Sequence, residues 1–129
     1  MIPAMTSDMH RRDGQDAAHP SVGSSARALQ RDFLFNLFTR QAAFLEIANE
    51  NDLYMALAYT VRDRMLQQFI TSAHSYFHHK SRTVAYLSAE YLVGPQLGYN
   101  LVTLGMYDEA REALGQLGIS VDALIDYER

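Results

Sequence analysis

Hydrophobic residues return every three or four positions after the first 25 residues, which is the spacing of an amphipathic helix. The residues in this stripe are Leu29, Phe33, Leu37, Phe38, Phe44 and Leu45. We therefore expect a helix from Ala26 onward, broken near residues 39–42. A longer helix is expected from Leu53 to about His78, a stretch without glycine or proline. Residues 49–52 precede it, and their short oxygen-bearing side chains can accept the N–H groups of its first turn.

The pattern changes after the basic stretch 80–82. Residues 83–87 read TVAYL, and a short run with β-favouring residues and apolar side chains on both faces predicts a strand buried on both sides. A lone buried strand cannot satisfy its backbone N–H and C=O groups. Its pairing partners are therefore expected outside these residues or in another chain.

Three short helices are expected in the last third of the chain. They cover residues 96–104, 107–117 and 120–127, with Gly105 and Gly118 ending the first two. The sequence thus predicts a mostly α chain, with about six helical pieces and one buried strand.

Length and composition restrict the class of protein. The chain has 129 residues, 48% of them hydrophobic, a net charge of −4 and no cysteine. One packed domain is possible, and nucleic acid is disfavoured because phosphate binding needs clustered Lys and Arg. No apolar run is long enough to span a membrane, and no secretory signal is evident, so a cytoplasmic protein is expected. Residues 1–25 are predicted to be a disordered leader because they are polar and lack a period.

Three groups of side chains on the long helix could carry chemistry, and each has a plainer interpretation. His74, His78 and His79 could bind a metal, but a solvated helix end with histidines near the C-terminal dipole is favoured. Residues 62–64, Arg-Asp-Arg, could bind phosphate, but a solvated helix face is favoured. The aromatic residues could stack on sugars, but a core position is favoured: they are Tyr54, Tyr59, Tyr76 and Phe77.

Glu90 follows the predicted strand directly. In open parallel sheets, ligand sites lie beyond the carboxyl ends of the strands, so a carboxylate there is a candidate site residue. Capping of nearby backbone N–H groups is the equally supported alternative. Gly94, Gly98 and Gly105 lack the strand–GxGxxG–helix context, and no nucleotide site is assigned to them.

Two separated blocks resemble the α-glucan phosphorylases, the family of glycogen, starch and maltodextrin phosphorylases. They are YLSAEYLVGPQLGYNLVTLG at 86–105 and DLYMALAYTVRDRML at 52–66, and their separation also agrees with the family. The segment LGISVDALIDYER at 117–129 is similar to the family's lead into a glycine-rich loop. The resemblance extends from about Phe33 to Arg129.

The resemblance implies an enzyme that cleaves the non-reducing ends of α-1,4-glucans with phosphate and releases glucose 1-phosphate. It implies a pyridoxal phosphate cofactor, two Rossmann-like domains facing a cleft, and a cytoplasmic homodimer. Residues 26–129 would be an incomplete N-terminal portion of the first domain. The isolated chain is then expected to be inactive.

Few of the family's functional residues can be carried over. Glu90 matches a glutamate that lines the catalytic cleft, where a carboxylate would act through water or by orienting donors. Leu92 stands where some members have a tyrosine that touches the cofactor, and Lys80, the chain's one lysine, has a different context from the Schiff-base lysine. No cofactor-binding residue and no metal ligand is therefore assigned.

The resemblance also bears on regulation. The positions aligned with an AMP site of animal enzymes are Ala73, His74 and Phe77, which lack the hydrogen bonding of the two glutamines and the tyrosine found there. Allosteric control by AMP is not expected.

Two other hypotheses stay open at this point. One is a stand-alone helical interaction or dimerisation module derived from the family. The other is a small carbohydrate-binding protein that uses the tyrosines.

Overall fold

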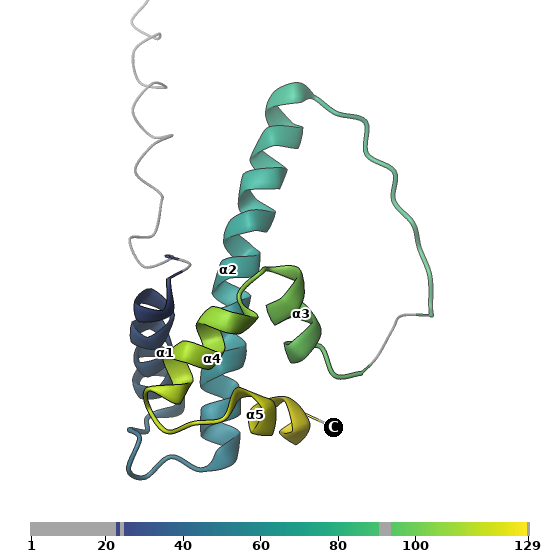
Figure 1. Ribbon diagram of the computed structural model, residues 1–129. Coiled ribbons are helices and arrows are strands. Elements are labelled where there is room, and N and C mark those ends of the chain that lie inside the picture. Colours follow the sequence, from purple (N-terminus) through teal and green to yellow (C-terminus); the bar gives the residue numbers. More distant parts are fainter. Residues whose placement is uncertain (1–22, 24, 91–93, 129) are drawn as a thin grey trace, which may run out of the picture.

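The structure is a computed structural model that describes residues 23, 25–90 and 94–128. This part of the chain is mostly helical, with five helices and no strand (Figure 1). The helices are α1 (Ala26–Gln41), α2 (Glu50–His79), α3 (Leu97–Thr103), α4 (Tyr107–Gly115) and α5 (Val121–Tyr127).

The two long helices begin at side-chain caps. Ser25 Oγ accepts a hydrogen bond from the Ala28 N–H at 3.3 Å and starts α1. Asn49 starts α2, where its side chain accepts from the Asp52 N–H at 3.0 Å while the Asn49 N–H donates to the Asp52 carboxylate at 3.1 Å. This reciprocal pair is a capping box, which satisfies two N–H groups at the helix end. The predicted cap in residues 49–52 is confirmed.

The helix ends also follow local chemistry. Gly105 and Gly118 have φ of 64° and 74°, a left-handed conformation that glycine adopts without steric cost. After α4 the Ile119 N–H donates to the Leu114 carbonyl at 2.9 Å, which completes the turn at Gly118. The predicted stops at both glycines are confirmed.

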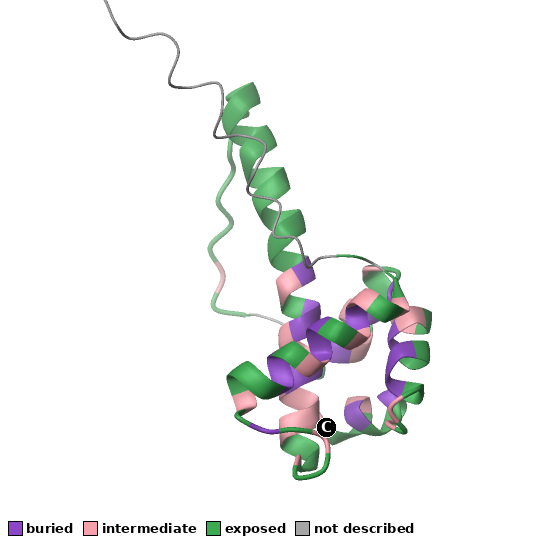
Figure 2. Ribbon diagram, turned by 90° about the vertical axis from the view of Figure 1, so that its left-hand side faces the viewer, coloured by how far each residue is buried: buried purple, intermediate pink, exposed green. Residues whose placement is uncertain are grey.

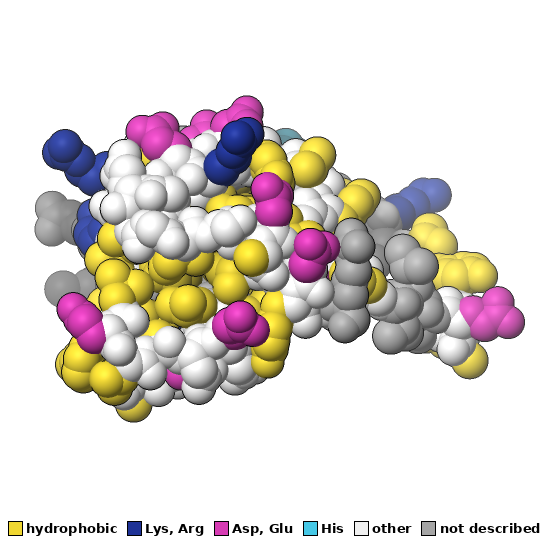
Figure 3. All heavy atoms as spheres, turned by 60° about the horizontal axis from the view of Figure 1, so that its bottom comes forward, with side chains coloured by type: hydrophobic (Ala, Val, Ile, Leu, Met, Phe, Trp, Pro, Cys, Tyr) yellow, Lys and Arg dark blue, Asp and Glu magenta, His cyan; other side chains and the backbone are white. Residues whose placement is uncertain are grey.

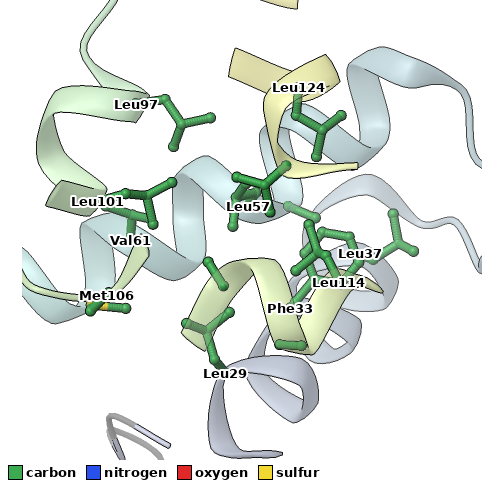
Figure 4. Packing of buried hydrophobic residues seen from close by; sticks show 14 of the residues in the cluster. Leu29, Phe33, Leu37, Leu57, Val61, Leu97, Leu101, Met106, Leu114 and Leu124 are labelled. Carbon is green, nitrogen blue, oxygen red and sulfur yellow. The ribbon is translucent and has the colours of Figure 1, made fainter. Parts of the chain in front are cut away.

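The core lies at one end of the molecule. The first half of α2 packs on α1, α4 covers α1, and α3 and α5 pack against α2. Figure 4 shows apolar side chains from all five helices meeting there, with Leu57 of α2 among them. The buried apolar residues are Leu29, Phe33, Leu37, Ala43, Ala56, Leu57, Val61, Leu97, Leu101, Met106, Ala110, Ala113, Leu114, Val121 and Leu124.

The second half of α2 extends beyond this core. All of residues 65–80 are exposed, and Figure 2 shows this part of the helix without buried positions. Phe69 is 68% exposed and Phe77 is 81% exposed. The predicted apolar stripe is therefore packed as far as Val61, and beyond Arg64 it has no partner among the described residues.

The predicted strand at 83–87 is wrong for this structure. Residues 81–90 have no regular secondary structure and run as a long trace from the far end of α2 toward α3 (Figure 1). Val84 and Leu87 are each 91% exposed. The physical reason is the one that made the strand incomplete: no other described segment is extended beside it, so its backbone groups have no sheet partner.

The predicted helical piece that follows the break near residues 39–42 is also wrong, because no helix lies among the described residues between α1 and α2. After α1 the chain makes one turn at residues 45–47, in which the N–H groups of Ile47 and Ala48 both donate to the Phe44 carbonyl at 3.0 Å. The leader predicted for residues 1–25 lies outside the described residues, apart from Gly23 and Ser25.

Candidate functional site

Glu90 lies at the end of the irregular segment 81–90. Its side chain is exposed, and its N–H donates to Ser88 Oγ at 3.0 Å while the Ser88 hydroxyl donates to the Glu90 carbonyl at 3.2 Å. The alternative in which Glu90 caps a helix is not supported, because α3 begins only at Leu97. No hydrogen bond or ion pair joins the Glu90 carboxylate to a described residue. Its role in a site stays a prediction. Leu92 lies outside the described residues.

Lys80 is the one side chain of the chain that could form a Schiff base with an aldehyde cofactor. It is the C-cap of α2, is exposed, and has φ of 47°. No described residue encloses it, and the expectation that Lys80 does not hold the cofactor stays a prediction.

The histidines near the end of α2 are exposed, as the favoured interpretation expected. The structure nevertheless brings two of them together. Nε2 of His74 and Nε2 of His78 are 3.0 Å apart, and the ring centroids are separated by 4.3 Å. No group of three or more potential metal ligands is found among the described residues.

The interpretation of residues 62–64 as a solvated face is wrong for one member. Arg64 is only 5% exposed, and its guanidinium donates to the Asp32 carboxylate of α1 at 3.0 Å. It also donates to the carbonyls of Thr60 at 3.0 Å and Gly23 at 2.9 Å. Arg62 remains exposed.

Asn36 continues this polar contact between α1 and α2. Its side-chain NH₂ group donates to Thr60 Oγ1 at 3.1 Å and to the Asp63 carboxylate at 3.4 Å, and its side-chain Oδ1 accepts from Arg40 Nε at 3.0 Å. The Arg40 guanidinium then lies 4.7 Å from the ring centre of Tyr59, a cation–π contact. These hydrogen bonds between α1 and α2 fix how the two helices pack against each other.

The aromatic residues of α2 separate into two pairs. Tyr54 packs against the core and Tyr59 is partly buried, whereas Tyr76 and Phe77 are 65% and 81% exposed. The predicted core position is thus confirmed for Tyr54 and wrong for Tyr76 and Phe77. Since the two pairs lie at different parts of a 30-residue helix, they do not form a single stacking platform.

Glu128 ties the end of the chain to the start of α3. Its carboxylate accepts from the N–H groups of Gln96 at 2.9 Å and Leu97 at 2.8 Å. Burial raises the pKa of the Tyr54 phenol, and the neighbouring Glu128 carboxylate raises it further. The Tyr107 hydroxyl donates to Asp122, and this hydrogen bond raises the pKa of Tyr107. Both arrangements are structural contacts between helices.

The sequence interpretation missed the buried pair of Asp32 and Arg64. A signal was present, because Asp32 and Asn36 fall on the same helix face as Leu29, Phe33 and Leu37. A charged residue within an apolar stripe is buried only with a partner. The partner lies on another helix, and the sequence pattern of α1 does not reveal which residue it is.

The positions aligned with an AMP site are exposed on the far half of α2. Beside them, the surface has a shallow hollow lined by amide and hydroxyl side chains: Gln67, Gln68, Thr71 and Ser72. Among the described residues, none that lines this hollow carries a charge that could pair with a phosphate. No helix in the described part of the chain has the length and apolar character needed to cross a membrane.

These observations define a helical domain with a closed core at one end and a bare half-helix and an exposed apolar segment at the other. No protein-family model matches the chain. Among curated proteins it is 48% identical over 107 residues to the glycogen phosphorylase of the cyanobacterium Synechocystis, covering 83% of this chain and 13% of that protein. It is 36% identical over 81 residues to the glycogen phosphorylase of Chlamydia trachomatis, covering 63% of this chain and 10% of the relative.

An animal relative matches as well. The brain form of glycogen phosphorylase from Bos taurus is 34% identical over 82 residues, covering 64% of this chain and 10% of that protein. The chain thus spans about a tenth of the length of the curated relatives that it matches. The resemblance to the α-glucan phosphorylases is confirmed: the chain is homologous to a part of the glycogen phosphorylases.

Proposed function

We propose that this chain is the N-terminal portion of an α-1,4-glucan phosphorylase, an enzyme that releases glucose 1-phosphate from glucan ends with phosphate. The observation that carries the proposal is the 48% identity to a glycogen phosphorylase over 83% of the chain. In this proposal residues 26–129 are an incomplete part of an α/β Rossmann-like domain in a two-domain enzyme. Pyridoxal phosphate, a homodimeric state and a cytoplasmic location follow from the family and belong to the same proposal.

The exposed apolar surface supports an incomplete domain. The side chains of Val84, Tyr86 and Leu87 are 86–91% exposed, and Phe69 and Phe77 on α2 are more than two-thirds exposed. Burying a side chain of this size stabilises a protein by about 1.5–3 kcal/mol. A larger domain that covers this surface would therefore gain much of its stability from it.

Glu90 is proposed to line the cleft of the complete enzyme in a supporting role. A carboxylate repels a phosphate anion at direct contact, so Glu90 would act through water or by orienting hydrogen-bond donors. Its exposed position at the end of an irregular segment is compatible with a cleft wall formed only when the rest of the domain is present. The cofactor would be held by residues other than Lys80, because the resemblance gives Lys80 a different context from that of the Schiff-base lysine.

A stand-alone helical interaction module derived from the family is the second candidate. The observation in its favour is that five helices already close a core without any further segment. It does not account for segment 83–87, whose large apolar side chains are 86–91% exposed and are not packed against other described residues. The enzyme proposal is therefore preferred.

The test is phosphorolysis by the complete product of the gene that encodes this chain. Glycogen and phosphate should yield glucose 1-phosphate with that product, at a rate that AMP does not change, and none with the 129-residue chain alone. A complete product without this activity would refute the proposal. Strong activation by AMP would refute the expectation that AMP does not control the enzyme. Release of glucose 1-phosphate by the 129-residue chain would refute the expectation that this chain alone is inactive.

The supporting role of Glu90 has its own test in the complete product. Glu90→Gln should lower kcat by roughly tenfold to a hundredfold, since one oriented donor in such a site is worth up to about 10²–10³. The matched control is Glu112→Gln, at an exposed position of α4. Equal activity in both variants would remove Glu90 from the site.

A further inference from the structure

Two imidazole nitrogens converge on the exposed face of α2 near its end. Nε2 of His74 and Nε2 of His78 are 3.0 Å apart, and the two rings are inclined by 65°. The residues are four positions apart, so they lie one turn apart on the same helix face. Histidines at this spacing on a helix are a recurrent pair of metal ligands.

The separation of the two nitrogens matches the spacing of two ligands on one metal ion. Bonds of about 2.0–2.1 Å to imidazole nitrogen place two cis ligands about 2.9 Å apart at a right angle and about 3.4 Å apart at the tetrahedral angle. The observed 3.0 Å, at which the two rings share a hydrogen bond in the absence of metal, lies within this range and close to the right-angle value. A right angle between nitrogen ligands is typical of the square-planar or tetragonal sites of Cu²⁺ and Ni²⁺.

We propose that His74 and His78 form a bidentate chelate for a divalent transition-metal ion, with Cu²⁺ bound most tightly. The site is open, because no third ligand of the chain gathers there among the described residues, and water would complete the coordination. No described residue covers it in the 129-residue chain, where every residue from 65 to 80 is exposed. Both side chains can therefore take up a metal ion without any rearrangement of the core.

His79 provides a control within the same chain. It is exposed, as His74 and His78 are, and it follows His78 directly. Adjacent residues on a helix point about 100° apart, so His79 lies off the face that His74 and His78 share. His79 can bind a metal only as a single imidazole, and a single imidazole lacks the advantage of a chelate.

The consequence for the structure is a stiffer end of α2. This half of the helix is exposed, and no other described helix packs on it. A metal bound across one turn links residues that otherwise separate when the helix frays. Metal binding should therefore slow amide hydrogen exchange in residues 74–79 and leave the core helices unchanged. A metal adsorbed on scattered surface groups would not have this local effect.

The experiment is a calorimetric titration of the 129-residue chain with CuCl₂, followed by Ni²⁺ and Zn²⁺. We expect one site that weakens by about tenfold or more in His74→Ala and equally in His78→Ala, because changes even beyond the ligands cost 10–100-fold in affinity. His79→Ala should retain the site. Cu²⁺ should bind more tightly than Ni²⁺ or Zn²⁺.

Hydrogen exchange with and without Cu²⁺ supplies the second measurement. Slowing confined to residues 74–79, present in His79→Ala and lost in His74→Ala, supports the chelate. Affinity that is unchanged in His74→Ala or His78→Ala, or lost equally in His79→Ala, overturns it. Exchange unaffected by the metal also overturns it. All three substitutions are at exposed side chains, so each variant should fold as the parent chain does.

Discussion

Asp32 and Arg64 join α1 to α2 at positions where apolar side chains would otherwise be expected. Arg64 is 5% exposed and Asp32 is 9% exposed, and the guanidinium also holds the carbonyls of Thr60 and Gly23. Charges that leave water need a partner, and here each charge has the other. The pair therefore orients the two helices, although an apolar pair could give equal stability.

Asp32→Ala should lower the free energy of unfolding by about 3–5 kcal/mol, because it leaves the Arg64 guanidinium buried without its counter-ion. Urea unfolding of the 129-residue chain measures this. Asp32→Leu combined with Arg64→Met should recover most of the loss. Arg27→Ala, at an exposed position of the same helix, is the control and should change stability by less than about 0.5 kcal/mol. A loss below 1 kcal/mol in Asp32→Ala would show that the pair is not buried in solution.

Tyr54 makes stability sensitive to alkaline pH. Its folded-state pKa is raised above the ordinary value of 10.0, by burial first and by Glu128 second. The neutral phenol is thus favoured by folding, so its contribution is present below pH 10 and is lost as the pH rises through the raised pKa. Tyr54→Phe should flatten the decline in unfolding free energy above about pH 10. Tyr86→Phe, at an exposed side chain, is the control, and equal declines in both variants would contradict the assignment.

At the scale of elements, the start of α2 and the stops after α3 and α4 are set by neighbouring residues, and these could be predicted from the sequence. Asn49 with Asp52 begins α2, and Gly105 and Gly118 follow α3 and α4, because capping is decided by a few neighbouring residues. The segment 83–87 could not be predicted in the same way. A strand exists only with a partner, and β-favouring residues cannot supply one.

The candidate site was predictable only as a position. Glu90 was recognised from the resemblance and from its place after residues 83–87, but the described residues bring no other functional group to it. The buried Arg64 and the convergence of His74 and His78 depend on tertiary contact and on side-chain rotamers. Spacing places His74 and His78 on one helix face, but it does not determine that their nitrogens meet, and it does not determine the burial of Arg64.

α3 owes its start to the other end of the described chain. It has only seven residues and no side-chain cap from Gln96, and the Glu128 carboxylate accepts its first N–H groups instead. Glu128→Ala should lower the free energy of unfolding by about 1 kcal/mol and speed hydrogen exchange in residues 97–103. Glu112→Ala, exposed on α4, is the control. Unchanged exchange in α3 would show that the helix does not depend on this cap.

At the scale of the molecule, the packed core lies at one end, and the far half of α2 extends away from it at the other. The exposed half of α2 and the segment 83–87 carry apolar side chains without partners (Figure 2). Seen from its lower end, the core also shows hydrophobic side chains gathered in a hollow with acidic groups on its rim (Figure 3). The exposed half of α2, the segment 83–87 and this hollow are the surfaces that a longer phosphorylase would cover.

Phe69 should therefore have different effects in two settings. In the 129-residue chain, Phe69→Ala should change stability by less than about 0.5 kcal/mol, since the ring is 68% exposed. In a complete phosphorylase that contains this chain, it should cost about 3 kcal/mol or more, because the ring would be buried. Phe33→Ala, at a fully buried position, should cost about 3–5 kcal/mol in both. Equal, small effects of Phe69→Ala in both settings would contradict a covered α2.

The most direct measurement exchanges the homologous segment between two proteins. The matched residues of this chain replace their counterpart in the Synechocystis glycogen phosphorylase, to which they are 48% identical over 107 residues. The chimera should release glucose 1-phosphate from glycogen and phosphate, and Glu90→Gln within it should lower kcat. A chimera that is soluble and unfolds at its parent's temperature, but releases no glucose 1-phosphate, would contradict the proposal that this chain is part of a working phosphorylase.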